Sequence, residues 1–331
     1  MARVGIPRAL AYYTYFPVWK AFLEGIGASV VLSRPTTRQI LDRGVEDAVT
    51  DACVPIKIIH GHVADLIGKV DYLFVPRLVS VRDRLVFCPK FLGLPDMIRY
   101  SITNLPQLID IRVDLRKGRL ELWRIACRVG RILGAGLPRT AKAYWAARSA
   151  WKELQARLQA RQTAPEAFAE MCGVKTGAEK AAQTGPKSLR FAVLGYPYAI
   201  HDPYVSGNLV ARLQSLGVEV VTADMLPRQI LRQQSKHVRK QLFWTYSDEA
   251  LRAGYYFYEH GGVDGVIHIT AFSCGPDAVV DKLLELEAKR RGTIPFISLM
   301  IDEHTGDAGI ATRLEAFSDM VRRRKERRRV S

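Results

Sequence analysis

The stretch VGIPRALAYYTYFPVWKAFLEGIGASVV at residues 4–31 decides the fold, because a similar stretch occurs again later in the chain. Residues 194–221 read LGYPYAIHDPYVSGNLVARLQSLGVEVV. Four features recur at a constant offset of 190 positions: Gly5-Ile-Pro7 with Gly195-Tyr-Pro197, Gly27 with Gly217, Val30-Val31 with Val220-Val221, and Arg38-Gln-Ile-Leu41 with Arg228-Gln-Ile-Leu231. Four matches at one offset indicate an internal duplication.

Each copy predicts strands that alternate with helices. An apolar segment leads into a helical stretch, a glycine ends that helix, and a second apolar segment follows. Further apolar strands begin at Asp71 and Asp264. This order is typical of a parallel sheet with right-handed crossovers. We therefore expect an α/β fold with two Rossmann-like, internally duplicated domains and a helical basic insert between them.

The domain boundaries follow from where the repeat stops. Residues 1–110 form the first predicted domain and contain Cys53 and Cys88, and residues 186–331 form the second and contain Cys274. Residues 111–185 have no counterpart in the repeat and form the predicted basic helical insert or linker.

The positive charge of the chain is concentrated in two places. The formal net charge is +16 over 331 residues. Residues 111–160 hold 12 Lys and Arg against 3 Asp and Glu, and residues 322–329 (RRRKERRR) hold 7 against 1. The predicted domains outside these segments are close to neutral, so a nucleic-acid partner is not expected. We interpret the two segments as a solvated helical face and a frayed basic tail, with weak binding to polyanions or to an acidic protein partner as the alternatives.

Other gross features predict a cytoplasmic protein without a membrane partner. No apolar run approaches the roughly 18 residues needed to cross a bilayer. The start MARVGIPR lacks the apolar region of a signal peptide. The five cysteines are odd in number and widely spaced, which does not suit a disulfide framework.

Three of the five cysteines share a local pattern. Cys53, Cys88 and Cys274 are each followed within two positions by a proline, whereas Cys127 and Cys172 are not. Proline stiffens a loop, and a cysteine at the start of a helix gains N–H groups and a positive dipole that favour a thiolate. Cys127 and Cys172 are predicted to be packing residues.

Three interpretations of these cysteines remain open on spacing alone. Three thiolates can hold a [4Fe–4S] cluster with one iron not bound by cysteine. They can also hold zinc with a histidine as fourth ligand. Buried cysteines that serve only as small apolar side chains are the third interpretation.

Two polar motifs are further site candidates. Glu303 and His304 follow the apolar strand 294–300, where a carboxylate beside a histidine can do acid–base work. The alternative is that this segment caps the helix that follows. Lys57 and His60 lie three apart on a predicted helix after Cys53 and can share a face. They are candidates for tuning a metal site, or simply members of a half-buried helix.

Two phosphate-binding motifs are absent. The chain contains no GxxxxGK[ST] loop, and its strand-to-helix turns carry Gly-x-Pro where a dinucleotide site needs GxGxxG. Dinucleotide binding is therefore not predicted.

The chain resembles a domain of large CoA-substrate-specific enzyme activases, which is akin to the D-component of 2-hydroxyglutaryl-CoA dehydratase and to benzoyl-CoA reductase subunits. The likeness covers both halves but neither the basic insert nor the tail. The segments that carry it include GIPRALAYYTYFPVWKAFLEGIGASVVLS, DACVPIKIIHGHVADLIG, VDYLFVPRLVS, FCPKFLGLPDMIR, VDGVIHITAFSCGPDAVV and LMIDEHTGDAGIATRLEAF.

The resemblance implies stacked Rossmann-like domains with a [4Fe–4S] cluster between them, held by Cys53, Cys88 and Cys274. It also implies a separate ATPase activator that drives a low-potential electron into the cluster, and a CoA thioester as substrate. Some relatives instead carry a double-cubane [8Fe–9S] cluster and reduce small molecules. On this basis Glu303 and His304 are candidate catalytic proton donors, and Lys57 and His60 are candidates to tune the cluster.

The resemblance thus predicts a component of an ATP-dependent reductase or dehydratase system, assembled as a homo- or hetero-oligomer. Two alternatives remain. One is a non-catalytic cluster-binding or regulatory partner of an activase, whose basic insert contacts an acidic surface. The other is a zinc-stabilised binding protein.

Overall fold

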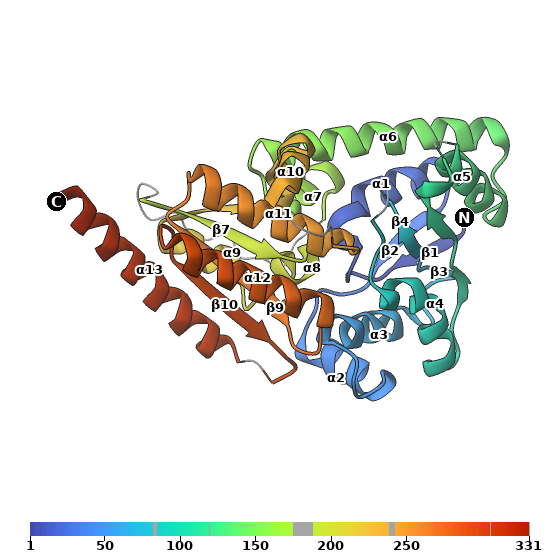
Figure 1. Ribbon diagram of the computed structural model, residues 1–331. Coiled ribbons are helices and arrows are strands. Elements are labelled where there is room, and N and C mark those ends of the chain that lie inside the picture. The colour runs from blue at the N-terminus through green and yellow to red at the C-terminus, as the bar shows by residue number, and fades with distance from the viewer. Residues whose placement is uncertain (82–84, 119, 175–187, 238–241, 305, 331) are drawn as a thin grey trace. The chain divides into compact units, whose positions relative to one another are not determined.

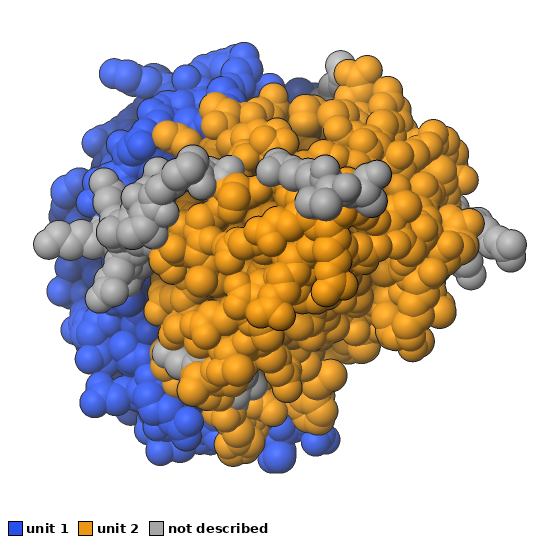
Figure 2. Space-filling model, turned by 90° about the vertical axis from the view of Figure 1, so that its left-hand side faces the viewer, with its two compact units in different colours: residues 1–157, 164–176, 242–245 blue, residues 158–163, 177–241, 246–331 orange. Residues whose placement is uncertain are grey.

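The chain forms two compact units, which are described separately (Figure 1, Figure 2). The computed structural model describes residues 1–331 apart from 82–84, 119, 175–187, 238–241, 305 and 331. Unit 1 comprises residues 1–157, 164–176 and 242–245, and unit 2 comprises residues 158–163, 177–241 and 246–331. Each unit is an α/β fold with a parallel sheet, which confirms the predicted fold class.

Unit 1 is built on a four-stranded parallel sheet in the order β2-β1-β3-β5. Its strands are β1 (Arg3–Ile6), β2 (Ser29–Leu32), β3 (Tyr72–Phe74) and β5 (Gln107–Ile109). The strand β1 buries Val4 and Ile6 completely, which accounts for the apolar run that follows the exposed Arg3. A separate parallel pair joins β4 (Arg77–Ser80) to β6 (Arg112–Asp114).

The helices of unit 1 include those of the predicted insert. They are α1 (Tyr12–Gly25), α2 (Arg38–Asp47), α3 (Val54–Leu66), α4 (Pro89–Ser101), α5 (Glu121–Ile132), α6 (Leu137–Gln159) and α7 (Ala164–Cys172). The insert packs on the repeat, because the ring of Phe168 in α7 contacts the rings of Tyr12 and Phe16 in α1. The insert is therefore helical, as predicted, and has a buried side.

The helices α2 and α3 cross at two glycines. A Cβ atom on Gly44 would lie 1.8 Å from the carbonyl oxygen of Lys57, and one on Gly61 would lie 1.8 Å from that of Ile40. No side chain fits in either gap, so the two backbones approach directly. This crossing fixes α3, the helix that begins just after Cys53, against α2.

Unit 2 repeats the same sheet in the order β10-β9-β7-β8. Its strands are β7 (Leu189–Gly195), β8 (Val218–Thr222), β9 (Gly265–Ala271) and β10 (Phe296–Ile301). Its helices are α8 (Pro197–His201), α9 (Leu209–Ser215), α10 (Arg228–Gln233), α11 (Thr245–His260), α12 (Gly275–Arg291) and α13 (Asp307–Val330). The buried side chains of β7 and β9 form the centre of this unit.

The two sheets confirm the internal duplication. In each unit the first strand of the copy lies between the second and the third, and all neighbours are parallel. Gly27 and Gly217 follow the ends of α1 and α9 with φ of +92° and +74°. That left-handed conformation favours glycine, as the sequence predicted for the ends of these helices.

The expectation of a frayed basic tail was wrong, because residues 322–329 belong to the helix α13. Three basic side chains of α13 bind the rest of unit 2: Arg322 donates to the carbonyl of Leu216, Arg324 donates to that of Gly292, and Lys325 pairs with Asp264. Phe317 of the same helix packs against Phe191 in β7. Buried contacts and charge-assisted hydrogen bonds therefore keep this segment helical.

The two longest helices, α6 and α13, are rich in arginine and lysine. Charged residues interrupt the apolar runs of both helices every few positions. Within the described residues, no helix is both long enough and apolar enough to cross a membrane.

Candidate metal centre

The cysteines of the proline pattern all stand immediately before a helix. Cys53 is the N-cap of α3, Cys88 that of α4 and Cys274 that of α12, and each helix has a proline in its first turn. The proline suits this position because the first N–H groups of a helix lack partners inside the helix. The sequence prediction that Cys274 opens a helix is confirmed, and the other two cysteines share its position.

In unit 1 the structure brings Cys53 and Cys88 into one electrostatic environment. Burial raises the pKa of both thiols. The charge of Lys90 opposes that shift at each sulfur, and a negative charge on Cys88 would raise the pKa of Cys53 further. The two sulfurs and one lysine therefore form a group that the sequence predicted only in part, since Lys90 was not singled out.

The backbone adds hydrogen-bond donors to this group. The N–H of Ile56 lowers the pKa of Cys53, and those of Phe91 and Lys90 lower the pKa of Cys88. These N–H groups belong to the first turns of α3 and α4. Two helix N-termini and one ammonium group can together stabilise negative charge on sulfur, which is what a thiolate-bound metal requires.

The two predicted tuning residues lie on α3 and are buried. Lys57 is 4% exposed and His60 is 1% exposed. The Nδ1–H of His60 donates to the carbonyl oxygen of Ile56 at 2.7 Å. Burial lowers the pKa of His60, so the imidazole is neutral at pH 7 with its lone pair on Nε2. The helix is buried along most of its length rather than half-buried.

The strand that precedes Cys274 in unit 2 contains a buried histidine that sequence reasoning missed. His268 of β9 is 0% exposed. Its Nδ1 lies 2.7 Å from Oδ1 of Asp281, and its Nε2 lies 3.3 Å from Oδ1 of Asp277. The Ser298 hydroxyl donates to the same Asp281 oxygen at 2.5 Å. Because Asp277 is in the first turn of α12, the pair anchors the start of that helix to the sheet.

The protonation of His268 follows from these contacts. Burial alone would lower its pKa, but the carboxylates of Asp277 and Asp281 outweigh burial and raise the pKa to about 9. The imidazolium form therefore predominates at pH 7. A usable signal was present in the sequence: a single histidine inside the apolar strand VIHIT, followed by carboxylates at Asp277 and Asp281, one helical turn apart.

Glu303 and His304 lie in the turn after β10. Glu303 is half-buried and His304 is exposed. The backbone N–H of His304 donates to Oδ1 of Asp302 at 2.9 Å, so Asp302 stabilises the turn itself. The catalytic role of Glu303 and His304 stays a prediction.

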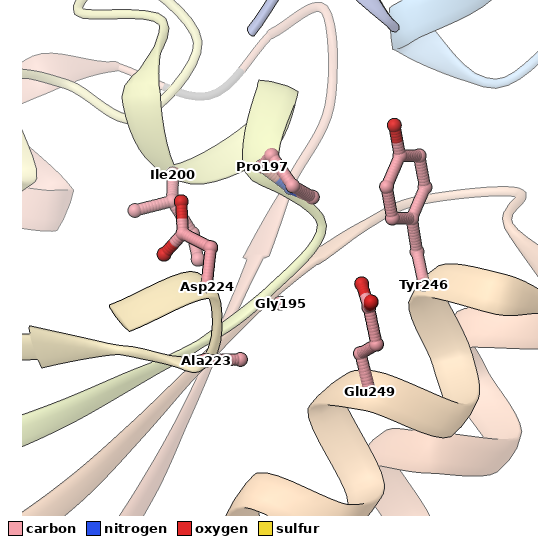
Figure 3. Close-up of a pocket in the computed structure, with 7 residues that line it drawn as sticks. All are labelled: Gly195, Pro197, Ile200, Ala223, Asp224, Tyr246 and Glu249. Carbon is pink, nitrogen blue, oxygen red and sulfur yellow. The ribbon is translucent and has the colours of Figure 1, made fainter. Parts of the chain in front are cut away.

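A small pocket lies at the carboxyl ends of β7 and β8 in unit 2 (Figure 3). Gly195 lines it with φ of +142°, and a Cβ there would lie 2.5 Å from the carbonyl of Ile269. This close approach accounts for the glycine of the Gly-x-Pro turn. Figure 3 shows the carboxylates of Asp224 and Glu249 on opposite sides of the pocket.

The charge of this pocket is negative. Asp224 accepts a hydrogen bond from the Thr222 hydroxyl and lies 3.0 Å from Nε2 of His201. Burial alone would raise the pKa of Asp224, but His201 and Thr222 outweigh it and hold that pKa below its usual range. An ionised carboxylate disfavours a phosphate group, so this pocket does not suit the phosphates of CoA.

The fit to a metal can be judged within each unit. Within the residues that the structure describes, no group of three or more His, Cys, Asp or Glu side chains is placed to hold a metal ion. Unit 1 alone supplies two thiols beside two helix N-termini and Lys90, and unit 2 supplies one thiol in the same helix-capping position. The donor chemistry of these positions fits a thiolate-ligated metal.

Duplicated parallel sheets and cysteine-capped helices define an α/β protein with thiols at strand-to-helix or helix-to-helix junctions. The chain belongs to the family described as the CoA enzyme activase uncharacterised domain (DUF2229), whose family model matches residues 3–226. This match confirms the resemblance inferred from the sequence. A search of curated proteins found no match.

Proposed function

We propose that this protein is an iron–sulfur component that takes a low-potential electron from a separate ATPase activator and passes it to a CoA thioester or another small substrate. The proposed ligands are Cys53, Cys88 and Cys274. The observation that carries the proposal is the grouping of Cys53 and Cys88 at two helix N-termini beside Lys90. Membership of the CoA enzyme activase family supports an enzyme-partner context.

The proposal assigns separate tasks to the chain's own residues. A [4Fe–4S] cluster, when bound, would supply one-electron chemistry at low potential, and a double-cubane cluster is the alternative form. The N–H groups at the starts of α3 and α4 would donate to sulfur, and Lys90 would offset its negative charge. The neutral His60 and the buried Lys57 would set the polarity around Cys53. Glu303 and His304 are the proposed proton donors.

Loss of the three cysteines is expected to abolish iron binding. Protein purified without oxygen should contain about four irons and four acid-labile sulfides per chain, or about eight irons for a double-cubane cluster. Cys53→Ser, Cys88→Ser and Cys274→Ser should each lose most of the iron and the reduced-state EPR signal. Cys127→Ser and Cys172→Ser are matched controls and should keep both, because those cysteines cap no helix N-terminus in the described structure.

The outcomes separate the alternatives. Iron-free protein after anaerobic reconstitution would refute the redox proposal, and stoichiometric zinc in its place would favour a zinc-stabilised binding protein. If iron is bound but neither a CoA thioester nor another small substrate is reduced with an ATPase activator and a low-potential donor, a non-catalytic cluster-binding role follows. Where substrate is reduced, Glu303→Gln and His304→Gln are expected to lower turnover without loss of iron, because each removes a proposed proton donor.

A further inference from the structure

The exposed surface of α5 and α6 in unit 1 carries many positive charges. All seven of its Lys and Arg side chains between residues 121 and 152 are exposed: Arg124, Arg128, Arg131, Arg139, Lys142, Arg148 and Lys152. Arg124 lies 3.6 Å from Glu121, and Arg139 donates to the carbonyl of Gly25. No carboxylate in the described part of the chain pairs with the other five.

Several basic residues elsewhere in the protein are neutralised. Arg290 and Arg291 both pair with Glu287, and Lys325 pairs with Asp264. Uncompensated charges on one surface repel each other, which costs folding free energy unless an anionic partner is present. Five cations without a carboxylate partner on two packed helices therefore favour an anionic partner at this surface.

Large apolar side chains are exposed among these cations. Trp145 is 66% exposed and Leu137 is 67% exposed in α6, and Leu122 and Ile132 of α5 are each 37% exposed. Lys142 and Arg148 lie three residues before and after Trp145, and Lys152 lies seven after it. At 3.6 residues per turn these positions surround the indole on one helix face. The guanidinium carbon of Arg148 lies 5.8 Å from the Trp145 ring centroid.

The opposite side of α6 is occupied by the rest of unit 1. Ala143 contacts α1 at Gly25, and the ring of Trp151 stacks on that of Tyr15 at 5.7 Å. Trp123 of α5 packs edge-on against Tyr144 of α6, so the two helices form a hairpin, seen side by side in Figure 1. The rigid attachment of this hairpin fixes Trp145 and its neighbouring cations on the outward face.

We propose that the exposed face of the α5–α6 hairpin binds the surface of an anionic phospholipid membrane. Cations would contact lipid phosphates, and Trp145 and Leu137 would enter the interfacial layer, as in helices that lie on a bilayer. Between residues 122 and 152 no exposed residue is acidic and Ser149 is the single exposed uncharged polar side chain. Protein interfaces generally contain a mixed set of hydrogen-bonding groups. Nucleic acid is bound mainly through hydrogen bonds to phosphates and base edges, which exposed aliphatic side chains do not form.

This inference revises the expectation that the protein has no membrane partner. That expectation rested on the absence of a spanning segment, which the structure leaves unchanged for its described helices. A helix that lies on a membrane surface needs apolar and basic side chains on only one face. A search for long apolar runs therefore does not detect it. It is independent of any metal at the cysteines.

The test is sedimentation of the full chain with lipid vesicles. Wild-type protein should bind vesicles containing about 30% phosphatidylglycerol and should bind phosphatidylcholine vesicles far less. Raising NaCl from about 0.1 M to about 0.5 M should release it. The variant Lys142→Glu/Arg148→Glu/Lys152→Glu should lower the partition coefficient at least about tenfold. Trp145→Gln should weaken binding and remove the fluorescence quenching by brominated lipid.

The control variant Arg232→Glu/Arg313→Glu/Arg323→Glu makes the same charge change at exposed sites in unit 2. It should lower binding far less. Equal losses in both variants would show attraction by net charge alone and overturn the proposal, as would the absence of vesicle binding. If wild type binds no vesicles but binds duplex DNA, and only the α6 variant loses that binding, the face belongs to nucleic acid. If instead only the α6 variant loses a wild-type dimer, the face belongs to self-association. Circular dichroism would verify that each variant is folded.

Discussion

Gly61→Ala is expected to disrupt the crossing of α2 and α3 in unit 1. The added Cβ would lie 1.8 Å from the carbonyl oxygen of Ile40 and 2.8 Å from its carbon, both in the backbone of α2. A backbone cannot rotate away as a flexible side chain can, so α2 and α3 must separate. Forced overpacking of a core costs about 3 kcal/mol or more in such cases, a large part of the total stability of a domain.

The measurement is denaturant unfolding of purified protein, with hydrogen exchange to locate the change in α2 and α3. Gly93→Ala is the matched control, because Gly93 lies inside α4 and a Cβ there meets nothing within 4 Å. That control should be neutral or more stable by up to about 1 kcal/mol, since alanine favours a helix over glycine. Equal stability of the Gly61 and Gly93 variants would contradict the direct backbone contact.

The Gly61 variant also tests how the candidate site is held. The crossing of α2 and α3 fixes the axis of α3, and Cys53 is the N-cap of that helix. If Gly61→Ala folds at low temperature, we expect it to hold less iron than wild type even though no cysteine has changed. Gly93→Ala, which also lies in a cysteine-capped helix, should keep its iron.

His268→Leu is expected to destabilise unit 2 by about 3–5 kcal/mol, because it leaves the buried carboxylate of Asp277 and the partly buried carboxylate of Asp281 without their cation. Asp277 is 1% exposed and has no other ion-pair partner among the described residues. Leucine also deletes the group that anchors α12 to β9. His260→Asn is the control: that ring is exposed, and its loss should change the free energy of unfolding by less than about 0.5 kcal/mol.

The same histidine predicts how stability depends on pH. Its folded-state pKa of about 9 lies above the ordinary value of 6.5, so the stabilisation is fully present below pH 6.5. It is lost as pH rises from 6.5 through 9, by about 3 kcal/mol in total. The free energy of unfolding, measured as wild type minus His268→Leu, should therefore fall across this interval. A difference that stays constant would show that His268 does not carry the proton in the folded protein.

The sequence alone determined the architecture, because the signals for it are local. Gly-x-Pro turns, helix-ending glycines and apolar strands recur at an offset of 190, and each depends on neighbours along the chain. The parallel sheets of both units were predicted from them. The helical insert was predicted from its composition, and the family from the resemblance of longer motifs. The position of Cys274 before a helix was also readable, since proline in a first turn and the apolar pattern after it are local as well.

Tertiary structure decided which polar side chains meet. Lys90 beside Cys53 and Cys88 depends on how α3 and α4 pack, and the pairing of His268 with Asp277 depends on how α12 lies on β9. Burial and ion pairing act between residues that are far apart in sequence, so no periodicity encodes them. The basic tail also depends on tertiary contacts, because its composition alone predicted a frayed end. Phe317 and the carbonyls that accept from Arg322 and Arg324 keep it helical. These contacts with the rest of unit 2 outweigh charge repulsion within the segment.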